Sequence, residues 1–151
     1  ICKEETKREL KKNLLLFFTG MKADSGVILT EQRNKTQENI QVLDKMVELA
    51  KELKRALENN NLTEFGNILH ENWLLKQKLA NGITNPAING YYEKAREAGA
   101  LGGKILGSGG GGFLLIYCEE KNQNKVREAL SDLKEASFNF ESQGSRIIYV
   151  G

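Results

Sequence analysis

The sequence has few of the residue types that hold metals or form disulfides. Cys2 and Cys118 are its two cysteines, and they lie far apart and outside any CxxC pair. Neither a zinc site nor a dense disulfide framework is therefore available, and we expect both thiols to be reduced. His70 is the single histidine, so any Ser-His-Asp arrangement would depend on it. We expect His70 to occupy a solvated helix position and the chain to hold no metal.

Charge of one sign and long apolar runs are also missing. The 22 Lys and Arg residues nearly balance the 20 Asp and Glu residues, which gives a net charge of +2. This balance provides no field that would attract nucleic acid or an acidic membrane. No run approaches the roughly 18 apolar residues of a transmembrane helix. The 151 residues suffice for one core, so we expect a soluble cytoplasmic protein without nucleic-acid or membrane partners.

Hydrophobic patterns predict both helices and strands. The apolar runs at 14–18 and 113–118 predict strands buried on both faces. Asn85 before Pro86 is typical of a helix start. Helical spacing predicts helices within 24–57, from 61 to about 79, from 86 to 99 and around 126–133. Apolar and polar residues alternate at 137–141, and an apolar segment follows at 146–150. Together they predict a hairpin near the C-terminus.

The order of these elements indicates the fold class. Helices and strands are mixed without regular βαβ alternation, which favours an α+β domain with an antiparallel sheet and helices on one face. The sequence has no internal repeat, linker or low-complexity tail, so we expect residues 1–151 to form one domain.

Glycine is abundant, although the chain has one proline, and it concentrates at 102–113. Gly109 to Gly112 follow one another directly, and each glycine fixed in a loop costs about 0.5–1 kcal/mol relative to alanine. A functional reason is that backbone without Cβ atoms can approach an anion and direct N–H groups toward phosphate. The alternatives are a flexible hairpin or glycines that let two elements pack closely. We favour the phosphate or site-lining interpretation.

Three common phosphate motifs do not fit this segment. Residues 107–112 satisfy G-x-G-x-x-G, but Phe113 begins a strand where a dinucleotide-binding motif requires a helix. A P-loop is excluded because Lys104 is followed by Ile105 and not by Ser or Thr. A protein-kinase glycine loop would need a catalytic loop further along the chain, and none follows.

The segment AlaLeuGlyGlyLysIleLeuGlySerGlyGlyGlyGlyPheLeuLeu, residues 100–115, resembles the C-terminal motif of the GHMP kinases, which include galactokinase, homoserine, mevalonate and phosphomevalonate kinases. The resemblance extends to residues 14–20, 73–80, 82–88 and 144–148, and so to nearly the whole chain. It is strongest to the sugar-kinase branch that contains D-glycero-D-manno-heptose 7-phosphate kinase and fucokinase. It implies a ferredoxin-like fold, in agreement with the α+β pattern.

This resemblance also implies an activity. GHMP kinases transfer the γ-phosphoryl group of ATP to an alcohol, and in the heptose branch to the anomeric hydroxyl of a sugar phosphate. The family's phosphate loop, its carboxylate for the acceptor hydroxyl and its Mg²⁺ ligand belong to an N-terminal domain that this sequence lacks. We therefore expect the C-terminal half of a kinase, inactive alone, whose partner domain binds most of the ATP and Mg²⁺.

The resemblance assigns roles to particular residues. It implies that the cleft is lined by Gly107, Ser108, Gly109, Gly110, Gly111 and Gly112, where the Ser108 hydroxyl adds a donor. Four more side chains are candidates for contact with a sugar or its phosphate, namely Lys104, Trp73, Lys76 and Lys78. For Lys104 a solvated or structural role is the favoured alternative, because strand alternation leaves its direction open. For Trp73 the helical spacing from Leu69 favours the core. No catalytic residue is expected in this chain.

Two interpretations from other classes remain. A non-catalytic regulatory ferredoxin-like domain would use the glycine loop to hold an anionic effector without turnover. An RNA-binding sheet is disfavoured, because no aromatic-rich RNP1-like segment accompanies the strands. Within the GHMP kinases, a fucokinase or another member is the alternative to a heptose phosphate kinase.

Overall fold

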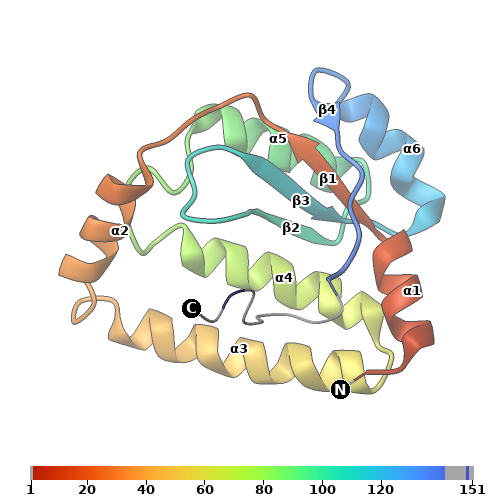
Figure 1. Ribbon diagram of the computed structural model, residues 1–151, viewed down its shortest axis with the longest axis horizontal. Coiled ribbons are helices and arrows are strands. Elements are labelled where there is room, and N and C mark those ends of the chain that lie inside the picture. The colour runs from red at the N-terminus through yellow and green to blue at the C-terminus, as the bar shows by residue number, and fades with distance from the viewer. Residues whose placement is uncertain (1, 142–148, 150–151) are drawn as a thin grey trace.

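The computed structural model describes residues 2–141 and 149. It confirms the α+β class: four strands form one antiparallel sheet in the order β2-β3-β1-β4, with helices around it (Figure 1). The strands are β1 Leu14–Phe18, β2 Gly102–Ile105, β3 Phe113–Tyr117 and β4 Lys134–Glu135. The helices of the described residues are α1 Glu4–Lys12, α2 Ser25–Asn34, α3 Ile40–Glu58, α4 Leu62–Lys76, α5 Pro86–Glu97 and α6 Glu120–Ala129. Among the described residues no helix is long and apolar enough to span a bilayer.

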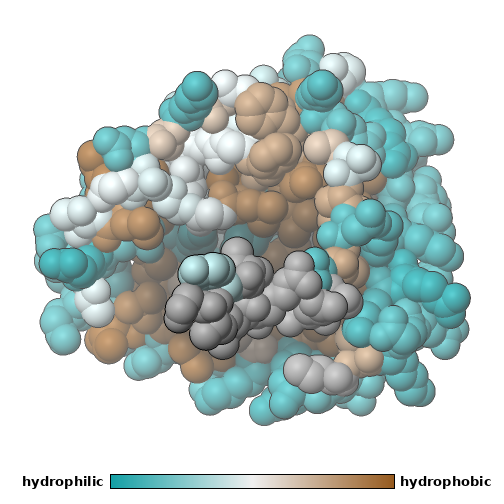
Figure 2. Space-filling model, in the orientation of Figure 1, coloured by the Kyte–Doolittle hydropathy of each residue, from teal (hydrophilic) through white to brown (hydrophobic). Residues whose placement is uncertain are grey.

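The two faces of the sheet have different surroundings. Side chains alternate between faces along a strand, so Leu15 and Ile116, which pair across β1 and β3, point to one face. They share a buried cluster with Ile88 of α5 and Val126 of α6, and Figure 1 shows α5 behind the sheet. The opposite face, here called the open face, is defined by Leu16, Phe18, Lys104, Phe113 and Leu115. Figure 2 shows apolar side chains gathered over β1 and β3 on this face.

Helix α4 lies directly against strand β2. A Cβ atom built on Gly102 would lie 2.1 Å from the Gly66 carbonyl oxygen, and a Cβ on Gly66 would lie 2.6 Å from the Tyr117 ring. Both positions therefore need glycine for space, because no side chain fits between helix and strand. Helix α3 packs on the far side of α4 through a cluster that includes Leu49 and Ile68. This packing brings the C-terminal end of α4 beside the loop that follows β2.

Several helix predictions agree with the structure. Asn61 caps α4 by accepting a hydrogen bond from the Glu64 N–H (3.2 Å), and Asn85 caps α5 by accepting one from the Ile88 N–H (3.0 Å). The helical stretch within 24–57 is divided into α2 and α3. At the division the Thr36 hydroxyl donates to two carbonyls of the preceding turn, which competes with helix continuation. Helix α4 ends at Lys76, before the expected end near 79.

The predicted hairpin near the C-terminus is wrong in its first arm. Residues 137–141 form no strand, and β4 lies just before them, where it pairs with the end of β1. Phe138 packs on a cluster that includes Leu14 and Tyr117, so its burial does not need a strand partner. The predicted second arm, 146–150, lies outside the described residues except for Tyr149. Helix α1 was not predicted, because Thr6 is its one buried residue and no apolar stripe marks it.

Candidate functional site

The loop of residues 106–112 joins β2 to β3 and is here called the glycine loop. Four of its residues have positive φ angles, namely Gly107 (81°), Gly109 (111°), Gly110 (76°) and Gly112 (81°). Residues with a Cβ atom adopt this conformation at a cost, so the path of the loop accounts for much of its glycine content.

The inner half of the loop, Gly109 to Gly111, is buried against other parts of the chain. A Cβ atom on Gly109 would lie 2.7 Å from the Ile83 backbone, and one on Gly110 would lie 2.5 Å from the Ala23 Cβ atom. The Gly110 N–H donates to the Ile83 carbonyl at 2.8 Å. These glycines are therefore explained by close packing, which is the alternative that the sequence left open.

Two polar side chains bind the C-terminal part of the loop. The Thr19 hydroxyl, which is buried, donates to the Gly112 carbonyl at 2.9 Å, and the Gly112 N–H donates to the Met21 carbonyl at 3.0 Å. The Asn85 amide, whose oxygen caps α5, reaches the Gly110 carbonyl at 3.5 Å. Sequence reasoning missed Thr19 as a positioning residue, although its place directly after an apolar strand is a usable signal.

The outer half of the loop, Gly107 and Ser108, faces solvent to a larger extent. A Cβ atom on Gly107 would meet nothing within 4 Å, and neither residue's N–H is bonded to another part of the described chain. Successive free N–H groups next to a glycine form a concavity that suits an anion. Of the predicted loop residues, these two combine solvent exposure with N–H groups that have no partner in the described chain.

Two lysines lie next to the outer half of the loop. Lys76, the last residue of α4, donates from its Nζ atom to the Gly107 carbonyl at 2.5 Å. Lys104 lies on β2 opposite Leu115 and therefore points to the open face. Burial and the positive charge of Lys104 lower the pKa of Lys76 to about 8, and burial lowers the pKa of Lys104 as well. Of these two predicted candidates, the structure thus binds Lys76 to the glycine loop.

The remaining candidates lie elsewhere. Trp73 is fully buried, with an indole N–H that has no partner among the described residues, so it is a core residue and not a sugar contact in this conformation. Lys78 is exposed. His70 is half-buried, lies 2.7 Å from the Tyr92 hydroxyl and stacks on that ring, so the expected solvated position is wrong. Burial lowers the pKa of His70 below its ordinary value.

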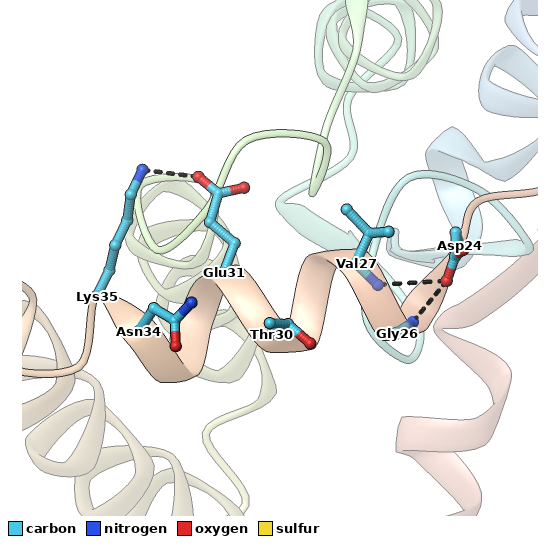
Figure 3. A pocket seen from close by; sticks show the side chains of 7 residues that line it. All are labelled: Asp24, Gly26, Val27, Thr30, Glu31, Asn34 and Lys35. Atoms are coloured by element: carbon cyan, nitrogen blue, oxygen red, sulfur yellow. Dashed lines mark hydrogen bonds and ion pairs between the residues drawn. The ribbon is translucent and has the colours of Figure 1, made fainter.

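A separate depression follows one side of α2, between Asp24 and Lys35 (Figure 3). Its charged groups already have partners within the chain. The Asp24 carboxylate caps α2 through the Gly26 and Val27 N–H groups, and Glu31 accepts from Lys35 at 2.6 Å. Thr30 and Asn34 also line this depression, and its charged groups are all engaged within the described part of the chain. In the described part of the chain, no three His, Cys, Asp or Glu side chains form a group that could hold a metal ion.

Comparisons with known proteins identify relatives of the chain. Residues 49–136 match the family model described as GHMP kinases C terminal. The chain is 32% identical to the bifunctional fucokinase/GDP-fucose pyrophosphorylase of Arabidopsis thaliana over 131 residues. This alignment covers 84% of this chain and 12% of that protein. It is 23% identical over 124 residues to the D-glycero-alpha-D-manno-heptose 7-phosphate kinase of Campylobacter jejuni, covering 81% of this chain and 37% of that protein.

Solved structures show the same fold. A D-glycero-D-manno-heptose 1-phosphate kinase from Bacteroides thetaiotaomicron matches with a TM-score of 0.57 and 26% identity, over 89% of this chain and 34% of that one. The mevalonate kinase of L. major, in complex with R-mevalonate, matches with a TM-score of 0.69 and 18% identity, over 79% of this chain and 37% of that one. At 18% identity the second match speaks for the fold alone. The chain spans little more than a third of these relatives' length at most.

Proposed function

This chain belongs to the GHMP kinase family through its C-terminal domain, and from that membership we propose that it is the C-terminal half of an ATP-dependent sugar kinase. The kinase transfers the γ-phosphoryl group of ATP to a sugar hydroxyl. Its acceptor is the anomeric hydroxyl of D-glycero-D-manno-heptose 7-phosphate, and the enzyme works in the cytoplasm. The N-terminal domain of the same kinase is the partner that completes the cleft.

One observation carries this proposal: the outer half of the glycine loop presents unbonded N–H groups of Gly107 and Ser108 beside Lys76. Phosphoryl transfer depends mainly on positioning and on stabilising the charge of the transferred group. Backbone N–H donors and an ammonium group supply that stabilisation without moving during the reaction. The matches to sugar kinases support a sugar as the acceptor.

In this proposal the residues of the chain have limited roles. Gly107 and Ser108 donate hydrogen bonds to phosphate oxygens, and the buried inner half of the loop keeps these donors in place. The chain contributes no base that takes the proton of the acceptor hydroxyl. Magnesium would neutralise phosphate charge when bound, and in this proposal its ligands belong to the N-terminal domain.

A fucokinase is the second candidate, and the 32% identity to the Arabidopsis protein favours it. The experiment that separates the candidates measures ADP release by the full-length protein with heptose 7-phosphate, fucose, galactose and mevalonate. We expect the highest kcat/KM with heptose 7-phosphate. A preference for fucose would replace the acceptor and keep the reaction, whereas effector binding without ADP release on any acceptor would favour a regulatory domain.

A further inference from the structure

Two asparagines of the chain are followed directly by glycine, and they differ in their surroundings. Asn81 and Gly82 are exposed and lie in the turn between α4 and α5, whereas Asn89 and Gly90 lie inside α5 and are half-buried. In an Asn-Gly pair the asparagine loses its amide readily, because the glycine has no side chain to hinder the attack of its backbone nitrogen. The fold therefore leaves one such pair in the open and encloses the other in a helix.

The two pairs also differ in whether their reacting groups are engaged. Among the described residues, neither the Gly82 N–H nor the Asn81 side-chain amide has a hydrogen-bond partner. The Asn89 side chain, in contrast, accepts a hydrogen bond from the Thr84 hydroxyl at 2.5 Å. The Gly90 N–H lies in the interior of α5, where backbone N–H groups donate to carbonyls of the preceding turn. Only the pair at 81–82 is therefore free to react without breaking structure.

We propose that Asn81 is a site of spontaneous deamidation, and that its isoaspartyl product disrupts the packing of residues 82–83 against the glycine loop. This inference does not depend on the proposed function.

The reaction needs only water as a co-reactant. The Gly82 nitrogen attacks the carbonyl carbon of the Asn81 side chain, and its proton goes to solvent. The new C–N bond closes a succinimide ring, the bond to the side-chain nitrogen breaks, and that nitrogen takes up a proton and leaves as ammonia. Water then opens the ring at one of its two carbonyl carbons, which gives aspartate or isoaspartate. In sum one water is consumed and one ammonia is released, with no oxidation or reduction.

The isoaspartyl product acts on the glycine loop through the backbone. In isoaspartate the main chain runs through the side chain, so it gains a carbon atom directly before Gly82 and Ile83. The Ile83 carbonyl accepts the Gly110 N–H at 2.8 Å, and a Cβ atom on Gly109 would lie 2.7 Å from the Ile83 backbone. A lengthened backbone displaces these tightly packed atoms, because close-packed interiors tolerate little shift. We therefore expect isoaspartate to destabilise the inner half of the loop.

The aspartyl product acts through charge alone. The Asn81 N–H donates to the Glu31 carboxylate at 3.1 Å, and Glu31 is paired with Lys35 at 2.6 Å (Figure 3). A carboxylate at position 81 adds a second negative charge next to Glu31, which the Lys35 ammonium offsets in part. Because the backbone keeps its length, Asn81→Asp should be destabilised less than the isoaspartyl product.

The first test follows both asparagines in one sample of the full-length protein during incubation at mildly alkaline pH. Peptide mapping by mass spectrometry detects the replacement of the amide by an acid, and labelling with an isoaspartyl methyltransferase detects isoaspartate. We expect Asn81 to convert at least about tenfold faster than Asn89, because Gly90 must first leave its helical hydrogen bond, and tenfold corresponds to about 1.4 kcal/mol. In guanidinium chloride the two rates should be similar, since each asparagine then precedes glycine in an unfolded chain.

Matched variants connect the modification to stability. Glutamine keeps the amide but closes the ring far more slowly, so Asn81→Gln should show no mass gain at position 81 and should keep its Tm during incubation. Asn34→Gln is the control, because Asn34 is exposed and is followed by Lys35 and not by glycine, and its Tm should fall with time as that of wild type does. Freshly purified Asn81→Asp should melt above the isoaspartyl fraction of incubated wild type.

Two results would overturn the proposal. The first is equal conversion of Asn81 and Asn89 in the folded protein, because the exposed turn would then give no advantage over the helix. The second is conversion of Asn81 to isoaspartate without a fall in Tm relative to Asn81→Gln, because the backbone before Gly82 would then not support the glycine loop. A faster conversion of Asn81 together with a lower Tm, both absent in Asn81→Gln, is the expected result.

Discussion

Gly107 and Gly110 have similar backbone conformations but different surroundings, so alanine variants at the two positions test why the loop needs glycine. Their φ angles are nearly equal, at 81° and 76°, so an added side chain meets the same backbone strain at both positions. Their surroundings differ: a Cβ atom on Gly107 meets nothing within 4 Å, whereas one on Gly110 lies 2.5 Å from the Ala23 Cβ atom and 2.7 Å from the Gly82 carbonyl oxygen. Comparing Gly107→Ala with Gly110→Ala therefore isolates the contribution of crowding.

The expected losses in the free energy of unfolding follow from backbone strain and from crowding. Left-handed backbone costs a residue with a Cβ atom about 1–2 kcal/mol, and the lower entropy of the unfolded alanine chain returns about 0.4–1 kcal/mol. Gly107→Ala should thus lower the free energy of unfolding by about 1 kcal/mol. Overpacking adds about 1–3 kcal/mol, and here the contacted atoms include backbone that cannot rotate away. Gly110→Ala should therefore lose about 2–4 kcal/mol.

The assay is thermal unfolding of the 151-residue chain, followed by circular dichroism, with urea unfolding as a second measure. For a domain of this size 1 kcal/mol corresponds to roughly 2–4 °C in Tm. The two variants should differ by about 2–12 °C, with Gly110→Ala the less stable. Equal shifts would refute the packing of the inner half against residues 82–83, because strain alone would then explain both variants.

Three further outcomes are expected. The isolated chain should melt cooperatively yet release no ADP above background with ATP, Mg²⁺ and a sugar phosphate, and robust turnover would contradict the two-domain proposal. It should also self-associate through the open face in a concentration-dependent way, and Phe113→Ser, at a side chain 38% exposed, should reduce this in sedimentation velocity, unlike the remote control Val27→Ser. Finally, the lowered pKa of His70 means that the unfolded chain binds a proton more readily than the fold, so stability should fall as pH drops below about 6.5. Between pH 7 and pH 5 the Tm of His70→Gln should fall less than the Tm of wild type. An equal fall in the two proteins would count against this explanation.

Local signals in the sequence were enough for the central strands and for α5. The run at 14–18 is apolar at every position and ends at Thr19, which matches β1 at Leu14–Phe18. Asn85 and Pro86 carry a complete helix-start signal within two residues, and the cap forms as expected. These elements were predictable because their signals are local. The expected burial of the strands on both faces is wrong, since Phe18 is 41% and Phe113 38% exposed on the open face.

Elements that depend on distant partners were not predictable in the same way. Strand β4 has two residues and exists because β1 offers an edge at Phe17 and Phe18. Helix α1 is polar almost throughout, so its sequence gives no buried stripe. The direction of Lys104 could not be read from alternation, because it depends on the register of β2 with β3, which pairs Lys104 with Leu115.

The glycine loop shows the same limit within a single run of residues. Gly109 and Gly110 are required by neighbours at 82–83 and at Ala23, which are distant in sequence, whereas Gly107 is required by its backbone conformation and leaves open space around it. Nothing in the sequence of the loop itself distinguishes these two causes. The division bears on the proposed function: because the inner half is fixed by packing, the N–H groups of the outer half are attached to a rigid support. Under that proposal a phosphate that binds them does not have to order the loop, and this preorganisation turns a structural requirement for glycine into a contribution to binding.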